Sequence, residues 1–539
     1  MNSCVKNFSI YLETAGNAVP KTDTVRRFID YLAVFGYNRF YLGCADTFRI
    51  EGEPYFGYMR GAYTAEELCD IDGYCKSKNI TFVVNTQTLA HQKCIPAYER
   101  FKKIIDIQDT LLADNDETYE FIEEMIATLS KCLSSKTIHL GMDEAFCLGG
   151  GKYYKTHKKV DRKEIFLKHL IRVCKIAEKY GLTCEIWGDM FFYSLSDGEA
   201  DDKTVLENLR RNIPENLKIV CWSYLNSDKE YIKQLLIKNK RISSNLALAR
   251  TLFNWTGFVP DNENSVRNFG NVVSACDGTG VNDIMLTMWS DSGGDGSIFS
   301  VLPAMYACSQ IYQGKASSIE TIDKEPFYKA TGISFDDFML LDKLNKPYDG
   351  KSYESVNNKT FIYLYNDPFI GLFDSMLSDG LARAFSGVSE RLKAVDGGQF
   401  QYVFDTVIAL ADALCIKCDL GKRIRENYLK ANRSELKRIA DKEIPKLSEL
   451  LYILFDKLSA QWERELKPFG LEVQTARIGT LLLRLKHVAK KLGDYSAGRI
   501  SAIEELEEKQ EKFGYRSNAT EDDYFLMCWV NIFTSGHCV

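Results

Sequence analysis

Short apolar runs alternate with amphipathic stretches over about the first 315 residues of the chain. The runs are short and rich in β-branched and aromatic residues, which favours strands. Eight strands are expected: Phe8–Glu13, Arg39–Gly43, Thr81–Asn85, Thr137–Gly141, Thr183–Trp187, Lys218–Trp222, Arg241–Asn245 and Ile284–Trp289. The stretches between them have apolar residues at helical spacing. The helices expected there are Asp23–Phe35, Ala65–Lys78, Glu117–Cys132, Arg162–Tyr180, Asp228–Lys238, Ser265–Ala275 and Val301–Tyr312.

Strands that alternate with helices predict an α/β fold with a parallel sheet. Eight such units in about 300 residues match the size of a (β/α)8 TIM barrel. An open, doubly wound sheet is the alternative, but it usually has fewer strands. No Gly-rich dinucleotide motif follows the first predicted strand, which also counts against it. We therefore predict a barrel over residues 1–315.

The pattern changes from about Lys315, where β-rich runs become scarce and long charged amphipathic stretches begin. The segment Leu344–Val356 contains Pro347 and Gly350 and indicates a linker or surface loop. We expect residues 316–539 to form an all-helical C-terminal domain that serves packing or oligomerisation, a homodimer being one form. The stretches that predict its helices are Met376–Val395, Gln401–Lys417, Glu435–Phe455 and Val473–Leu492.

Composition excludes several classes of protein. The 539 residues carry a net charge of −6, so no basic surplus is available for nucleic-acid phosphates. No window has the ~20 apolar residues of a membrane helix, and the first residues lack a signal-peptide pattern. The 16 cysteines are scattered, which is typical of reduced thiols in the cytoplasm. Only six histidines occur, without an HExxH pair, so we expect no catalytic zinc site.

The active site of a TIM barrel lies at the carboxyl ends of its strands. An adjacent acid pair, Asp143-Glu144, follows the fourth predicted strand, and one member can transfer a proton while the other serves a neighbouring group. Tryptophans gather at the same ends, and aromatic rings stack on the apolar faces of sugars. The other candidates at these ends are His91, His139, Trp187, Trp222, Tyr224, Trp255, Trp289 and Asp291.

Each candidate also has an ordinary structural explanation. An Asp-Glu pair is common at a helix N-terminus, where acids interact favourably with the helix dipole. A single tryptophan at a strand end is more often part of the core, Tyr224 could be a packing tyrosine, and His91 and His139 could be core histidines. The predicted gathering of the acids and four tryptophans at one face of a barrel is what favours a sugar site.

The hexapeptide His139-Leu-Gly-Met-Asp143-Glu144 resembles the H-x-G-x-D-E motif of glycoside hydrolase family 20, the β-N-acetylhexosaminidases. The resemblance extends from Phe8 to about Tyr312, and more loosely into the helical part, in the branch with a bare barrel and a helical C-terminal domain. The other segments that carry it are Tyr55-Phe-Gly-Tyr-Met-Arg60, Gln87-Thr-Leu-Ala-His91, Gly149-Gly-Gly-Lys-Tyr153, Trp187-Gly-Asp-Met-Phe-Phe192, Trp255-Thr-Gly-Phe and Gly293-Gly294.

The resemblance implies exo-acting, retaining hydrolysis in which the 2-acetamido group of the sugar is the nucleophile and forms an oxazolinium intermediate. Glu144 is then the general acid and base, Asp143 accepts a hydrogen bond from the acetamide N–H, and Tyr224 holds the acetamide oxygen. The implied partner is a small soluble glycan, and the resemblance implies no cofactor and no metal. Residues implied to bind or orient it are Trp187, Trp222, Trp255, Trp289, His91, His139, Asp291 and Asp295.

Three positions depart from the pattern of this branch. Gly16 stands where the first strand usually ends in an arginine, Arg49 stands where an acid is usual, and Asp295 replaces a glutamate. These changes concern recognition of the outer hydroxyls, with Arg49 as a candidate replacement cation. The alternatives are therefore a β-N-acetylgalactosaminidase, an enzyme for a substituted hexosamine, or a non-catalytic sugar-binding barrel. Retention of Asp143, Glu144 and Tyr224 counts against the last.

Overall fold

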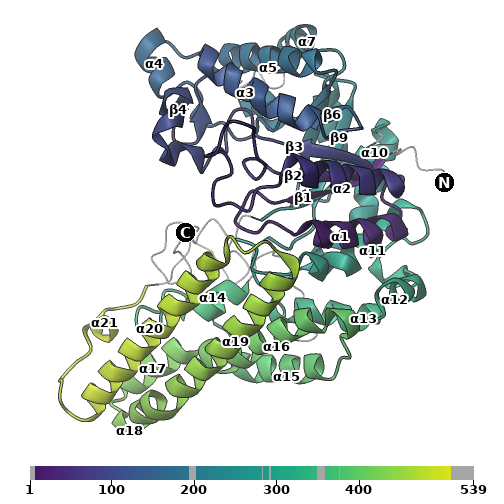
Figure 1. Ribbon diagram of the computed structural model, residues 1–539. Helices are drawn as coiled ribbons and strands as arrows, with labels where there is room; N and C mark the ends of the chain where they lie inside the picture. Colours follow the sequence, from purple (N-terminus) through teal and green to yellow (C-terminus); the bar gives the residue numbers. More distant parts are fainter. Residues whose placement is uncertain are drawn as a thin grey trace. The chain divides into compact units, whose positions relative to one another are not determined.

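The computed structural model describes residues 7–193, 202–255, 257–281, 283–290, 293–348, 359–374 and 377–511 (Figure 1). The chain forms two compact units. The first consists of Met1–Leu252, Val266–Trp289 and Met305–Ile322, and the second of Phe253–Ser265, Ser290–Ala304 and Asp323–Val539. The units therefore do not divide at a single point in the chain. The boundary that we predict at 315/316 falls inside the last segment of the first unit.

The first unit contains a closed parallel barrel in the strand order β1-β2-β3-β6-β7-β8-β9-β10, with β10 pairing back to β1. The predicted α/β barrel is confirmed, and the open sheet is excluded. The barrel strands are β1 (Asn7–Glu13), β2 (Arg39–Gly43), β3 (Thr81–Asn85), β6 (Thr137–His139), β7 (Thr183–Trp187), β8 (Lys218–Trp222), β9 (Leu246–Thr251) and β10 (Asp283–Met288). A short antiparallel pair, β4 (Ile105–Ile107) and β5 (Thr110–Leu111), follows β3.

Five of the helices given below for the first unit begin at a side chain that accepts a hydrogen bond from the first turn. Thr64 forms a capping box with Glu67, and Asn115, Asp161, Asp202 and Asp228 cap four further helices. The helices are α1 (Thr22–Phe35), α2 (Ala65–Ser77), α3 (Asp116–Ser130), α4 (Lys152–His157), α5 (Arg162–Lys179), α6 (Asp189–Tyr193), α7 (Lys203–Asn212), α8 (Lys229–Lys240), α10 (Phe269–Thr279) and α11 (Leu302–Tyr312).

The prediction of a strand over Arg241–Asn245 was wrong. These residues form the turn after α8, in which the Ser243 hydroxyl accepts from the Asn245 N–H, and the strand is β9, Leu246–Thr251. All six residues of β9 are buried, but its two alanines and Arg250 weaken the β-rich signal in the sequence. The predicted helix Ser265–Ala275 is also two pieces, α9 (Asn262–Val266) and α10, separated by Asn268 with φ +57°.

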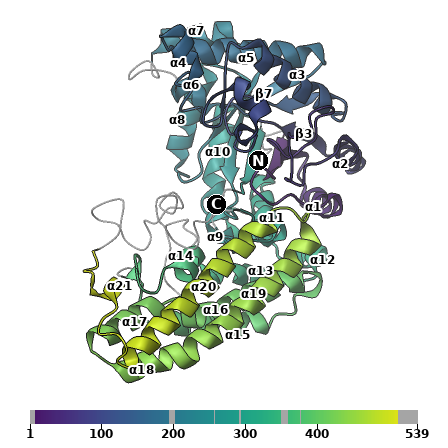
Figure 2. The ribbon, with the colours of Figure 1, turned by 60° about the vertical axis from the view of Figure 1, so that its left-hand side comes forward.

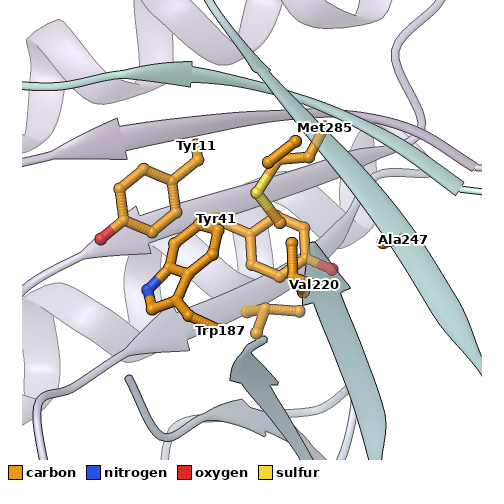
Figure 3. Close-up of a cluster of buried hydrophobic side chains, with 8 residues drawn as sticks. Tyr11, Tyr41, Trp187, Val220, Ala247 and Met285 are labelled. Atoms are coloured by element: carbon orange, nitrogen blue, oxygen red, sulfur yellow. The ribbon is translucent and has the colours of Figure 1, made fainter. Parts of the chain in front are cut away.

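Side chains of alternate strand residues fill the barrel interior, as the period of two requires. Figure 3 shows the central layer, in which the Trp187 indole nitrogen and the Tyr11 hydroxyl point one way and the Tyr41 hydroxyl points the other. The cluster consists of Tyr11, Tyr41, Val83, Trp187, Val220, Ala247, Ala249 and Met285, with Trp222, Tyr224 and Trp289 packed against it.

An ion cluster closes the interior at the opposite end of the strands. Glu185 accepts a hydrogen bond from the Tyr41 hydroxyl at 2.8 Å and pairs with Arg39 at 3.1 Å and Lys218 at 3.3 Å. Arg39, Lys218 and Asp283 are the first residues of β2, β8 and β10. Burial alone would raise the pKa of Glu185, but the two cations lower it to about 2.

The second unit is helical, and its predicted fold class is confirmed. α16 packs against α15 and α19, and α19 against α20 (Figure 2). The helix predicted over Glu435–Phe455 is interrupted by a π-turn at Ile439–Glu443. The longer helices are α15 (Leu381–Lys393), α16 (Gln401–Lys417), α17 (Leu420–Leu429), α19 (Ile444–Glu465) and α20 (Leu471–Ser496). Across the described residues, every helix is too short or too polar to cross a bilayer.

Replacing Glu185 should destabilise the barrel strongly. The Glu185→Gln variant keeps the shape of the side chain, but Arg39 and Lys218 then have only Asp283 as a partner. The buried cluster is left with one uncompensated positive charge, which should cost about 3–5 kcal/mol in unfolding free energy. Glu164→Gln, which removes only the exposed pair with Lys168, should have little effect. Urea unfolding at pH 7 measures both. In the wild type, the contribution of Glu185 should be lost as the pH falls from about 4.5 towards 2, because its folded pKa is depressed.

Candidate active site

The turn after β6 carries the acid pair in an unusual backbone conformation. Gly141, Met142 and Glu144 have φ of +70°, +71° and +49°, in the left-handed region. The Gln87 side chain holds this turn from the end of β3. Its Oε1 accepts from the Met142 N–H at 3.2 Å, and its Nε2 donates to Asp143 Oδ1 at 3.0 Å. Non-glycine residues adopt such angles at a cost of about 1–3 kcal/mol each, so the surrounding contacts determine the conformation.

Asp143 is the more enclosed of the two acids, and it is held ionised. Its Oδ2 lies 3.4 Å from His91 Nε2. Burial works against the charge on Asp143, but the hydrogen bonds from His91 and Gln87 and the positive charge of His91 keep its pKa below the usual value. Burial likewise works against a charge on His91, yet Asp143 raises the pKa of that imidazole to about 9. The pair is therefore an imidazolium–carboxylate pair at neutral pH.

Glu144 is the more accessible acid. The exposed fraction of its side chain is 43%, against 15% for Asp143, and its Oε2 lies 3.7 Å from His91 Nε2. Its backbone N–H donates to Asp189 Oδ2 at 2.9 Å, from the first residue of α6. Burial and the nearby charge of Asp143 raise the pKa of Asp189 to about 7. The pair is thus divided into an inner carboxylate and an outer, solvent-accessible acid.

An aromatic wall extends from the barrel core towards the same strand ends. Tyr11 lies 4.9 Å from Trp289 and 5.6 Å from Trp187, and the rings of Trp222 and Tyr224 are stacked at 5.2 Å. Trp187 is buried, whereas Trp222, Tyr224 and Trp289 are only partly buried. The indole nitrogens of Trp187 and Trp289 are enclosed without a hydrogen-bond partner. This wall offers flat apolar faces together with N–H and O–H groups, as a sugar site requires.

His139 is a buried support beneath the acid turn. Its Nδ1 accepts from the Asn85 side-chain amide at 2.8 Å and from the Gly141 N–H at 3.2 Å, so the ring proton is assigned to Nε2. The Tyr11 hydroxyl donates to the same Asn85 at 3.0 Å. Burial lowers the pKa of His139 to about 4, which keeps the ring neutral. His139 therefore orients the turn, and its ring packs 4.6 Å from Trp187.

The structure brings together His91, His139, Asp143, Glu144, Trp187, Trp222, Tyr224 and Trp289 within the first unit. Trp255 and Asp295 belong to the second unit, and Asp291 lies outside the described residues.

The placement of Asp295 differs from the expected contact with sugar hydroxyls. Its carboxylate is fully enclosed, pairs with Arg477 at 2.9 Å and accepts a hydrogen bond from Gln474. Both partners lie on α20, so this carboxylate holds the segment after β10 to the helical unit.

Gln87, Asn85 and Asp189 support the site without having been assigned a role from the sequence. Each lies at or just after the carboxyl end of a barrel strand, and that position is the signal that could have identified them. Their hydrogen bonds go to the backbone or side chains of the acid turn and of His139. Such contacts depend on the local backbone, which the sequence pattern does not specify. In the parts of the chain that the structure describes, no cluster of His, Cys, Asp and Glu is arranged to hold a metal.

An acid pair of this kind, at the strand ends of a (β/α)8 barrel and beside an aromatic wall, is typical of glycoside hydrolases. A family model described as glycosyl hydrolase family 20, catalytic domain, matches residues 10–242. A second, described as glycoside hydrolase 20C C-terminal domain, matches residues 336–525. The chain belongs to glycoside hydrolase family 20.

Individual relatives are distant. Beta-hexosaminidase 3 of Arabidopsis thaliana is 24% identical over 241 residues, which cover 41% of this chain and 44% of that protein. The GH20 exo β-N-acetylglucosaminidase of Vibrio harveyi has 12% identity and a TM-score of 0.46, over 63% of this chain and 58% of its own. The chitobiase of Flavobacterium johnsoniae has 15% identity and a TM-score of 0.45, over 92% and 71%. The chain thus spans about half the length of the first two relatives.

A side chain at Gly141 should destabilise the turn. A Cβ at this position would collide with the side-chain oxygen of Gln87, on a backbone with φ +70°. Gly181 has φ +68° with nothing within 4 Å of its Cβ, so Gly181→Ala isolates the cost of backbone strain. We expect Gly181→Ala to cost about 1–2 kcal/mol. Gly141→Ala should cost at least about 1 kcal/mol more, because Gln87 must also move. Equal unfolding free energies for the two variants would contradict the role of Gln87 in holding the turn.

Proposed function

We propose that this protein is an exo-acting, retaining β-N-acetylhexosaminidase that uses the acetamido group of its substrate as the nucleophile. The observation that supports the proposal most strongly is the division of the acid pair. Asp143 is enclosed and ionised beside His91, whereas Glu144, the next residue, is accessible. Proton transfer to a leaving oxygen and stabilisation of a developing cation need two carboxyl groups with these different environments.

In the first step, the acetamide N–H donates a hydrogen bond to Asp143 and the Tyr224 hydroxyl donates to the acetamide oxygen. That oxygen attacks the anomeric carbon as the glycosidic bond breaks, and Glu144 gives its proton to the leaving oxygen. The products of this step are the free leaving group and a sugar oxazolinium ion. In the second step, Glu144 takes a proton from water, and the resulting hydroxyl bonds to the anomeric carbon and reopens the ring with retained configuration.

Asp143 and the aromatic wall have complementary parts in this reaction. The oxazolinium ion carries a positive charge, and an ionised carboxylate in an enclosed site stabilises such a charge more than it would in water. The flat faces of Trp222 and Trp289 suit the methyl group and ring of the sugar, and Trp187 supports them from within the core. His91 contacts both carboxylates and so fixes the separation of their charges.

The configuration of the hexosamine depends on the groups near the end of β1. Arg49 is exposed, so it is a poor substitute for the arginine that family members usually carry at Gly16. Arg60 instead pairs with Asp46 at 3.2 Å and donates to the Ala15 carbonyl, next to Gly16. We propose that Arg60 restores a cation there. The ratio of kcat/KM for the gluco and galacto nitrophenyl substrates, measured for the wild type and for Arg60→Leu, tests whether Arg60 contributes to recognition of the sugar hydroxyls.

The Glu144→Gln variant should lose at least about 10²-fold in kcat on a substrate with a poor leaving group, because general acid–base catalysis contributes about 10²–10⁴-fold. A dinitrophenyl glycoside needs little protonation, so its first step should be affected less. Glu164→Gln serves as the control for removal of a surface carboxylate. Near-normal turnover of the poor substrate by folded Glu144→Gln protein would remove Glu144 from the role. Absence of turnover by the wild type would favour the sugar-binding alternative.

A thiazoline analogue of the oxazolinium ion should inhibit the wild type strongly, because it resembles the charged intermediate. The Asp143→Asn variant should bind it at least about tenfold more weakly, since a neutral amide does not balance the charge and leaves His91 without its partner. The inhibition constants of both proteins measure the effect. Equal hydrolysis of plain β-glucosides, which lack the 2-acetamido group, would contradict substrate assistance.

A further inference from the structure

Two exposed aromatic rings lie beside the proposed acid and have no part in the reaction described above. Phe146 is 47% exposed and Tyr193 is 44% exposed, and their ring centroids are 4.7 Å apart with an interplanar angle of 59°. Phe146 comes from the turn after β6, and Tyr193 is the last residue of α6, which follows β7. Other large side chains, such as Tyr231, are as exposed, but these two rings contact each other beside the proposed acid and so form one contiguous aromatic patch there.

The position of both rings is fixed relative to Glu144. The Phe146 N–H donates to the Glu144 carbonyl at 2.6 Å, which closes a tight turn. On the other side, Asp189 accepts from the Glu144 N–H, and α6 runs from Asp189 to Tyr193. The ring pair therefore joins the two segments that hold the backbone of Glu144.

Core packing accounts for a different residue of α6. Phe191 is fully buried and packs against Phe166 of α5 at 5.3 Å, so it anchors the helix to the barrel. Tyr193 lies two residues further on and remains accessible together with Phe146. A ring pair that served only to anchor α6 would gain more free energy if it were buried as Phe191 is.

The acids define which side of the site the rings occupy. The sugar that is attacked must contact the enclosed Asp143, whereas the leaving oxygen must contact Glu144, whose side chain is almost three times as exposed. The part of the glycan beyond that oxygen then continues on the accessible side of Glu144. Phe146 is two residues after Glu144, and Tyr193 ends the helix whose first residue, Asp189, accepts from the Glu144 N–H.

We propose that Phe146 and Tyr193 form a binding site for the sugar ring of the leaving group, an inference that rests on the proposed function. The occupant is the next pyranose of a β-linked glycan, whose apolar C–H face stacks on an aromatic ring. Such a site favours substrates that extend beyond one sugar. Its contact with the second ring stabilises the bound substrate and the transition state equally.

The test compares two substrates that share the reactive sugar and differ in the leaving group. One is a β-linked N-acetylhexosamine disaccharide, and the other is the methyl β-glycoside of the same hexosamine, which has no second ring. The variants are Phe146→Leu and Tyr193→Leu, which keep apolar bulk but lose the flat face. Phe146→Tyr and Tyr193→Phe keep the ring and serve as matched controls. Thermal melting establishes that each protein is folded.

We expect each leucine variant to lower the ratio of disaccharide to methyl-glycoside kcat/KM by about 3- to 10-fold, the effect of one aromatic stacking contact. The ring-keeping controls should stay within about twofold of the wild-type ratio. An equal loss on both substrates would show that the rings act through the position of Glu144 and would overturn the proposal, as would an unchanged ratio. If the wild type hydrolysed neither substrate, the proposed function would fail and this site with it. Hydrolysis of both with an unchanged ratio would refute the ring site alone.

Discussion

The backbone turn from Gly141 to Glu144 is the constraint on which the site depends. Two successive residues in an ordinary strand point to opposite faces, so adjacent acids would not share one pocket. Here Met142 and Glu144 adopt positive φ, and the turn carries both carboxyl groups to within reach of the single imidazole of His91. Gln87 and Asp189, which follow the neighbouring strands β3 and β7, hydrogen-bond the turn from both sides. The strain is therefore balanced by contacts that only the closed barrel provides.

Charge is layered along the barrel axis. At the amino ends of the strands, Glu185 is matched by Arg39 and Lys218. At the carboxyl ends, Asp143 is matched by His91. The layer between them is aromatic and neutral, and His139, which is kept uncharged by burial, packs against its Trp187. Because each buried charge has its own partner, the carboxylate at the site does not depend on the cations at the far end, and the aromatic layer remains free of net charge.

The sequence predicts the barrel well where strands are β-branched or aromatic. Arg39–Gly43, Thr81–Asn85, Thr183–Trp187 and Lys218–Trp222 are each found at the expected bounds. The strand β9 was misplaced because alanines and a buried arginine occupy it, and the Arg250 guanidinium is held by the Ser223 and Asn226 carbonyls rather than by solvent. Tertiary burial, which a local pattern does not contain, decides that strand.

Some residues of the candidate site could likewise be predicted from the sequence, and others could not. Residues that directly follow a strand, such as Asp143 and Trp187, can be identified by position, because all carboxyl ends of a parallel barrel meet on one face. The clamp by Gln87 could not be predicted, since it depends on the left-handed turn opposite it. Asp295 shows the reverse error. The family resemblance implied a sugar contact for this residue, but its partner Arg477 is 182 residues away in the sequence. Only the folded chain brings the two together.

The helical unit does not consist of one C-terminal segment alone. The chain enters the second unit three times, and two of those entries are the segments that follow β9 and β10. Each is held there by buried polar contacts. Asn262 donates to Asp342 at 2.9 Å, Lys346 pairs with Asp261, and Ser297 hydrogen-bonds Glu465. Buried polar groups of this kind are costly when unmatched, so these segments and the helices must order together. The conformation of the segments that follow β9 and β10 is therefore determined by residues 80 or more positions downstream in the chain.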